Sequence, residues 1–248
     1  MKKGFLTANI LLITAVLLGD LYYYFHGTTL LKGIVSFGFV LLAVTNLIYS
    51  IRTKASNLKY PALMTIGAIF AMVGDILLGS QFALGAASFA IGHVFFATSY
   101  CMLSKFQLRN LIPGICIFVP PLLLMTLAPF FDYGSLFMEM LCITYAAVIC
   151  VMVGKAIANF MQHKSVLYGV ILAGSILFYI SDLMLLLYVF GGAPKITDTI
   201  CIGTYYPAQC LLAHSLYHAA TSKAAQVSAF SAQESNIIET NITTQKIS

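Results

Sequence analysis

The sequence has few charged residues. Asp, Glu, Lys and Arg make up 8% of its 248 residues, whereas soluble domains contain about 25%. Hydrophobic residues make up 60% of the chain. This composition excludes an ordinary soluble globular protein and indicates an integral membrane protein. The 13 Lys and Arg residues are scattered between apolar runs and form no basic stripe, so the net charge of +5 does not indicate a nucleic-acid-binding protein.

Cysteine motifs for metal binding are also lacking. The six cysteines show no CxxC spacing, and all of them lie inside or at the ends of apolar segments. We interpret them as small buried hydrophobic residues. Together with the few histidines they make no zinc-binding set. We therefore expect neither a metal nor another cofactor.

Long apolar runs dominate the chain. A β-barrel would need alternating segments of about ten residues, which are absent, so the runs predict a bundle of helices. The first run is too long for the core of a signal peptide, which has about 7 to 15 residues. Eight runs are long enough to span a bilayer: roughly 5–25, 30–51, 60–80, 84–104, 110–128, 135–154, 166–190 and 198–218.

The positive charges predict the topology. Eleven of the Lys and Arg residues fall on one side of such a bundle, and only Lys32 and Lys195 fall on the other. By the positive-inside rule both termini are cytoplasmic, and we expect a location in a bacterial inner (plasma) membrane. Residues 1–220 are predicted to form the transmembrane domain, and the polar residues 221–248 a disordered cytoplasmic tail.

Two aspartates lie where a carboxylate is costly. Gly74-Asp75 and Ser181-Asp182 are each inside a predicted span, where a charge costs at least about 2.5 kcal/mol. They fall on the third helix of each half of the chain, which suggests two parallel four-helix halves. Asp20 in the first span has similar neighbours, so this short pattern can also recur by chance.

Polar residues gather in the outer half of the predicted bundle. At a rise of about 1.5 Å per residue, Asp75 and Asp182 lie five and eight residues from the outer ends of their spans. A pocket shared between helices would let such groups meet each other or water, so we expect both carboxyl groups to face one cavity. Alternatively, a lone histidine can be a packing element, and a lysine can extend to the headgroups. The other polar residues on this side are Lys32, Tyr205, Tyr206 and Gln209, and His93 lies near the middle of the fourth predicted helix.

The order of these residues resembles a known family. Lys32 opens the second predicted helix, and Met72-Val73-Gly74-Asp75 lies in the third. The motif Phe82-x-x-Gly85-x-x-x-Phe89-x-x-x-His93-x-x-Phe96 follows, then Gly174-Ser175-x-Leu177-Phe178-x-x-Ser181-Asp182 and Tyr205-Tyr206-x-Ala208-Gln209-x-Leu211. From Lys32 to about His218 the chain resembles the YhhN-like family of eight-helix membrane proteins, which includes the lysoplasmalogenases. That family usually has Lys-Pro at the start of the second helix, whereas Gly33 follows Lys32 here.

The resemblance implies a membrane-embedded ether hydrolase whose partners are membrane lipids. A lysoplasmalogenase cleaves the vinyl ether bond of a lysophospholipid to a fatty aldehyde and glycerophosphoethanolamine or glycerophosphocholine. This reaction needs one carboxylic acid to protonate the double bond and a carboxylate to stabilise the cation and activate water. We expect Asp75 and Asp182 to be this acid–base pair. His93, Tyr205, Tyr206 and Gln209 are expected to orient water or the ether oxygen, and Lys32 to meet the lipid phosphate.

A different class of function is also compatible with the sequence. Intramembrane acids in a repeated bundle suit a proton-coupled transporter, or a protein that binds or senses lipid without turnover. Transporters of this kind usually contain a matched pair of broken helices. Only the fifth predicted helix is strongly broken, by Pro113, Pro120 and Pro121, and it carries no acid.

Overall fold

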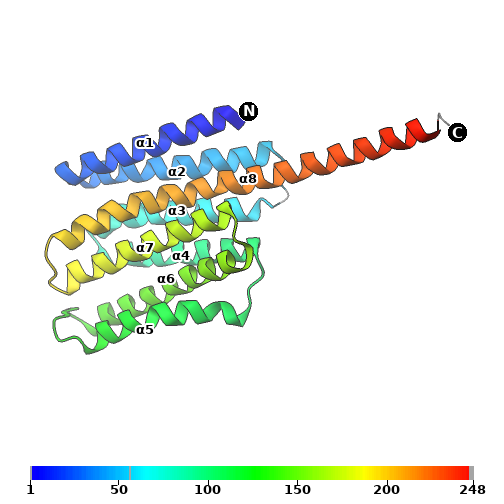
Figure 1. The fold of residues 1–248 in the computed structure, drawn as a ribbon. Helices are drawn as coiled ribbons and strands as arrows, with labels where there is room; N and C mark the ends of the chain where they lie inside the picture. Colours follow the sequence, from blue (N-terminus) through cyan, green and yellow to red (C-terminus); the bar gives the residue numbers. More distant parts are fainter. Residues whose placement is uncertain (1, 56, 246–248) are drawn as a thin grey trace.

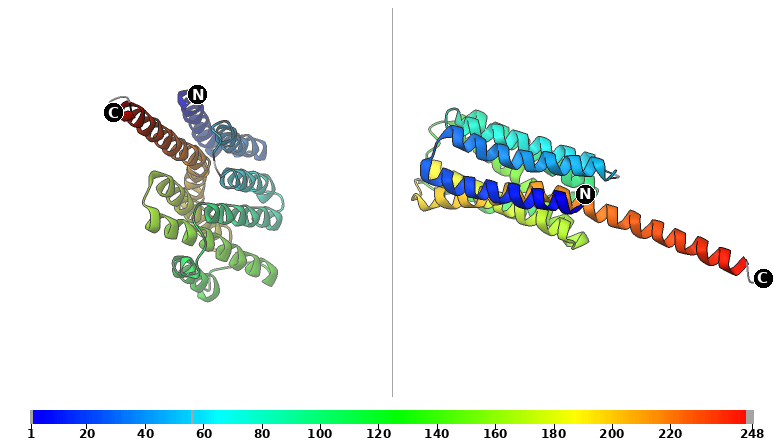
Figure 2. Two further views of the ribbon diagram at one scale, coloured as in Figure 1. Left: turned by 90° about the vertical axis from the view of Figure 1, so that its right-hand side faces the viewer. Right: turned by 90° about the horizontal axis from the view of Figure 1, so that it is seen from above.

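The computed structural model describes residues 2–55 and 57–245, with side chains up to Ser222. The described residues form helices that run side by side in one bundle (Figures 1 and 2). The predicted all-α fold is confirmed. The elements are α1 (Lys2–His26), α2 (Thr29–Arg52), α3 (Lys59–Leu78), α4 (Phe82–Leu103), the 3-10 turn η1 (Leu108–Asn110), α5 (Leu111–Leu127), α6 (Leu136–His163), α7 (Val166–Phe190) and α8 (Ile196–Gln245).

Seven of the described helices, α1 to α7, are long and apolar enough to cross a membrane. The chain is therefore a multi-pass membrane protein. The eighth predicted span, 198–218, lies in α8, which packs along α7, α2 and α1. It buries polar side chains such as Gln209 and Ser215 against the other helices. A helix that faces protein instead of lipid can carry such groups, which explains why α8 is less apolar than its neighbours.

The two halves of the bundle pack in the same way. The most extensive helix pairs are α3 with α4 and α7 with α8, and α2 packs on α8 as α6 packs on α4. A Cβ added to Gly67 on α3 would lie 3.1 Å from the carbonyl oxygen of Gly92 on α4. One added to Gly174 on α7 would lie 3.2 Å from the carbonyl oxygen of Ala208 on α8. The structure thus contains two similar four-helix units, as the repeated motif Gly74-Asp75 and Ser181-Asp182 suggests.

The bounds of α6 differ from the predicted span. The span was expected to end at residue 154, before the charge of Lys155, but α6 continues to His163. Lys155 is buried, and its ammonium group donates to the carbonyl oxygen of Lys105 at 3.0 Å. The charge does not end the helix, because the loop after α4 supplies a partner for it.

The chain enters the bundle and α8 leaves it at the same end (Figure 1). The cytoplasmic location of that end stays a prediction. Helix α8 then projects beyond the bundle into residues 221–245, part of the segment expected to be a disordered tail. A helix that lacks tertiary packing is only marginally stable in water. The helical form of this segment is therefore compatible with the predicted disorder, which stays a prediction. Residues 246–248 lie outside the described residues.

Close packing of α5 on α6 depends on two glycines, and we predict that Gly154→Ala destabilises the bundle. A Cβ at Gly154 would lie 2.6 Å from the backbone of Gly114, which cannot rotate away. We expect a loss of about 1–3 kcal/mol, measured by thermal unfolding in detergent. Gly203→Ala is the matched control, because no atom lies within 4 Å of its added Cβ. Equal stability of the two variants would contradict the prediction.

Candidate functional site

Asp75 is buried at the centre of the first polar network, named here the Asp75 network. Its Oδ2 accepts hydrogen bonds from Ser36 on α2 and Tyr205 on α8, each at 2.6 Å. Its Oδ1 lies 3.3 Å from the ammonium group of Lys32. The Asp75 side chain is 2% exposed and that of Lys32 19%. Both carboxylate oxygens therefore have donors, and the charge of Asp75 is compensated inside the bundle.

Local helix structure explains this arrangement. The side chain of Thr28 accepts a hydrogen bond from the backbone N–H of Leu31, which caps the start of α2. Lys32 and Ser36 follow on the same face one turn apart, because residues four apart are neighbours on a helix. On α3, the absence of a side chain at Gly74 lets the ring of Phe89 approach next to Asp75.

Two further predicted residues belong to the Asp75 network. The hydroxyl of Tyr206 lies 3.4 Å from that of Ser36, and the side-chain amide of Gln209 donates to the Tyr205 hydroxyl at 3.3 Å. Tyr206 and Gln209 are both buried. The structure thus brings together five of the seven predicted site residues: Lys32, Asp75, Tyr205, Tyr206 and Gln209.

Asp182 on α7 is the centre of a second network, named here the Asp182 network. Its Oδ2 accepts a hydrogen bond from the Tyr145 hydroxyl at 2.7 Å and lies 3.2 Å from Nε2 of His93. Nε2 of His93 is also 2.9 Å from the Tyr145 hydroxyl. No described residue hydrogen-bonds to Oδ1 of Asp182, and the side chain is 12% exposed. One oxygen of Asp182 is therefore held in place and the other is available.

A pocket opens next to Asp182. It contains about 670 Å³ of space free of atoms, counting its open mouth. Its walls come from α3 to α7 and are almost entirely apolar, with Asp182 as the sole carboxylate among the described residues that line it. The remaining lining residues include Leu78, Phe89, Leu141, Ile149 and Leu186. The pocket suits a hydrocarbon chain that brings one reactive or cationic group to Asp182.

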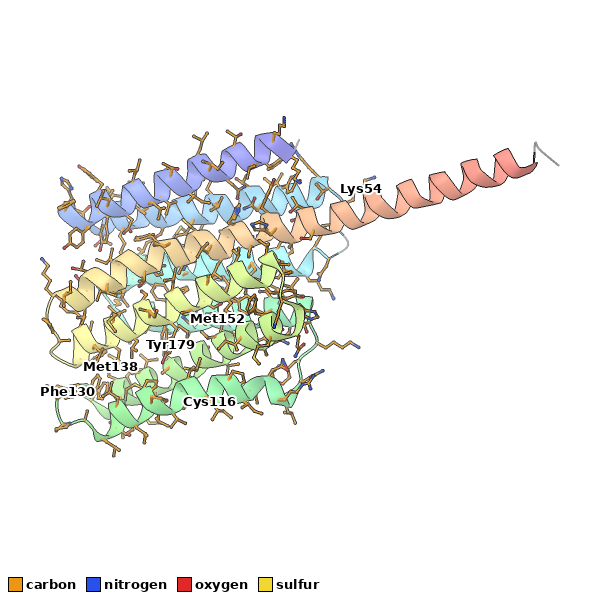
Figure 3. The ribbon with its side chains drawn as sticks, viewed as in Figure 1. Lys54, Cys116, Phe130, Met138, Met152 and Tyr179 are labelled. Atoms are coloured by element: carbon orange, nitrogen blue, oxygen red, sulfur yellow. The ribbon has the colours of Figure 1, made fainter. Side chains whose placement is uncertain are left out.

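The wall between α5 and α7 depends on a proline. Pro121 lacks an N–H group and so leaves the carbonyl oxygen of Ile117 without its helical partner. Tyr179, labelled in Figure 3, reaches from α7 and donates its hydroxyl to this oxygen at 3.1 Å. Pro121 and Tyr179 both line the pocket. Helix α5 is continuous through its prolines, and the hydrogen bond from Tyr179 replaces the missing helical one on this side of the pocket.

Aromatic rings connect the two networks. The Phe178 ring is 4.6 Å from the His93 ring and 5.3 Å from the Tyr205 ring. Asp182 lines the pocket, but Asp75 is not among the residues that line it. The expectation that both aspartates face one cavity does not match this arrangement. The physical reason is that each aspartate finds hydrogen-bond donors on different neighbouring helices.

Sequence reasoning missed Ser36 and Tyr145, although each donates directly to an aspartate. Ser36 could have been found from its position one turn after Lys32 on the same helix face. Tyr145 is a polar residue well inside the sixth predicted span, and its position was the available signal. Within the described residues, no three His, Cys, Asp or Glu side chains are close enough to hold a metal ion.

We predict that Lys32→Met destabilises the protein, because it leaves the buried Asp75 carboxylate without its cation. The expected loss is on the order of 3 kcal/mol, measured by denaturant unfolding in detergent. The double variant Lys32→Met/Asp75→Asn should recover much of this loss, since it removes both charges. If the double variant were as unstable as the sum of the single variants, the ion pair would not be the cause.

Comparisons with known proteins identify the family of this chain. They found no matching curated protein and no matching solved structure. The profile of the YhhN family matches residues 27–216, a range that holds Lys32, Asp75, His93 and Asp182. Because this match covers most of the membrane bundle, the chain belongs to the YhhN family.

Proposed function

We propose that this protein is a membrane-embedded hydrolase that cleaves the vinyl ether bond of lysoplasmalogens. The products would be a fatty aldehyde and glycerophosphoethanolamine or glycerophosphocholine. The observation that carries the proposal is the pocket, whose apolar walls suit an alkenyl chain. Among the described residues that line it Asp182 is the one carboxylate, and none of the described residues bonds to its Oδ1. Membership of the YhhN family supports the same reaction class.

The reaction can be written with the groups of the Asp182 network. The protonated Asp182 carboxyl group gives its proton to the β-carbon of the vinyl ether, and an oxocarbenium ion forms at the α-carbon. The Asp182 carboxylate then stabilises this cation and takes a proton from the water that adds to it. The resulting hemiacetal collapses to the aldehyde and the glycerol hydroxyl. A single carboxyl group in a poorly solvated pocket can thus act first as the acid and then as the base.

Tyr145 and His93 hold Asp182 in position for this chemistry. Both contact Oδ2, so Oδ1 is left to face the substrate. Their donors also stabilise the carboxylate form that appears after proton transfer. His93 therefore acts on Asp182 in this proposal, instead of on water or the ether oxygen directly.

Asp75 receives a different role from the one expected from sequence. Because its two oxygens are engaged by Lys32, Ser36 and Tyr205, it positions the helices beside the pocket. Lys32 is partly exposed and stays our proposed contact for the lipid phosphate. Tyr205 contacts the Phe89 ring, which lines the pocket, so the Asp75 network supports that wall.

The test is to incubate the purified protein with lysoplasmalogen and measure aldehyde release. We expect Asp182→Asn to lower the rate by about 10²-fold or more, as loss of a general acid does. Substrates with a saturated ether or an ester at the same position should yield no aldehyde. Absence of aldehyde from the wild-type protein over a panel of lyso and diacyl vinyl ethers would contradict the proposed function.

The Asp75→Asn variant separates the two aspartates. If Asp75 only positions the bundle, folded Asp75→Asn protein should keep measurable activity, in contrast to Asp182→Asn. Loss of activity equal to that of Asp182→Asn, in protein with unchanged unfolding temperature, would place Asp75 in the chemistry.

Tyr145→Phe removes one hydroxyl from the Asp182 network without changing the shape of the ring. We expect kcat to fall by about ten- to a hundredfold, which corresponds to one lost charge-assisted hydrogen bond. KM should change little, because the ring still lines the pocket. Tyr179→Phe is the matched control, since that hydroxyl lines the same pocket but donates to the Ile117 carbonyl oxygen and not to Asp182.

A further inference from the structure

The two networks occupy corresponding places in the two halves of the bundle. Each aspartate lies on the third helix of its half and accepts a hydrogen bond from the second helix of that half, Ser36 on α2 or Tyr145 on α6. Each also contacts a side chain on the fourth helix of the other half, Tyr205 on α8 or His93 on α4. Each half of the bundle therefore supplies one contact to the aspartate of the other half.

This correspondence locates the counterpart of Lys32. Lys32 lies four residues before Ser36, and Leu141 lies four residues before Tyr145. Residues four apart share a helix face, so Leu141 stands in the second half where Lys32 stands in the first. Leu141 lines the pocket. In the first half an ammonium group lies 3.3 Å from Oδ1 of Asp75, whereas in the second half no described residue bonds to Oδ1 of Asp182.

We infer that the pocket binds a long-chain primary alkylammonium ion, with the ammonium group on Oδ1 of Asp182 and the chain along the apolar wall. The ammonium of Lys32 on Asp75 is the internal precedent for this contact. The rings of Phe89, Tyr145 and Tyr179 line the same pocket, and aromatic faces attract cations. Such a ligand satisfies the free carboxylate oxygen and the apolar walls at once.

This inference extends the proposed function, and its relevance to catalysis rests on that function. An ammonium ion on Asp182 resembles the oxocarbenium ion that vinyl ether cleavage would form at the same oxygen. Ligands that resemble a transition state bind more tightly than the substrate does. A long-chain amine should therefore inhibit aldehyde release competitively, and a neutral alcohol of the same length should not.

Binding is tested with dodecylamine and dodecanol as probes, on purified protein in a maltoside detergent. At a concentration about 100 times its Kd, dodecylamine should raise the unfolding temperature by about 5 °C or more. Dodecanol should have a much smaller effect. Asp182→Asn should abolish the difference between the two probes. Glu139→Gln should keep it, because this carboxylate in the first turn of α6 is not part of the pocket wall.

The variant Leu141→Lys provides a second test, because it places a lysine at the counterpart of Lys32. Its ammonium group should occupy Asp182, so that the folded variant no longer responds to dodecylamine. Leu141→Met is the matched control and should respond as the wild-type protein does. Adding Asp182→Asn to Leu141→Lys should lower stability further, since it leaves the new ammonium unpaired.

The outcomes separate this inference from the proposed function. Equal shifts with dodecylamine and dodecanol, or an unchanged response in Asp182→Asn, would overturn the ammonium site even if aldehyde is released. A selective amine response that depends on Asp182 would support the site even if no vinyl ether is cleaved. Competitive inhibition of aldehyde release by dodecylamine would support both.

Discussion

A carboxylate inside a membrane-spanning helix needs hydrogen-bond donors from other helices, because the backbone N–H groups of its own helix are already paired. Asp75 and Asp182 each satisfy this requirement with side chains from two neighbouring helices. Each aspartate therefore links three helices. In both cases one partner helix belongs to the opposite half of the chain, so the two halves depend on each other.

The two networks solve the same electrostatic problem in different ways. The Asp75 network contains its own cation, Lys32, and has no free carboxylate oxygen. In the Asp182 network Leu141 stands at the position that corresponds to Lys32, and the Asp182 carboxylate faces a pocket. A duplicated arrangement thus gives one closed and one open site. The closed site holds a compensated charge inside the bundle, and the open site is the one for which we propose chemistry and the binding of a cation.

Much of the fold was accessible from the sequence, because membrane-spanning helices have a strong compositional signal. The apolar runs predicted the helices, and the repeated motif Gly74-Asp75 and Ser181-Asp182 indicated the two halves. The end of α6 was missed because Lys155 looked like the end of a span, and only the approach of the loop after α4 provides its partner. Five predicted site residues gather around Asp75, while Asp182 and His93 form a separate group with the unpredicted Tyr145.

The sequence by itself determined that this chain is a helical membrane protein with two costly aspartates and a family's pattern of polar residues. These properties depend on composition and on order along the chain. Only the tertiary structure decided that the aspartates belong to different networks and that one of them lines a pocket. The reason is that depth along a helix can be counted from sequence, whereas the direction of a side chain depends on which helices pack beside it. Two side-chain contacts between the halves, His93 on α4 with Asp182 on α7 and Tyr205 on α8 with Asp75 on α3, made that choice.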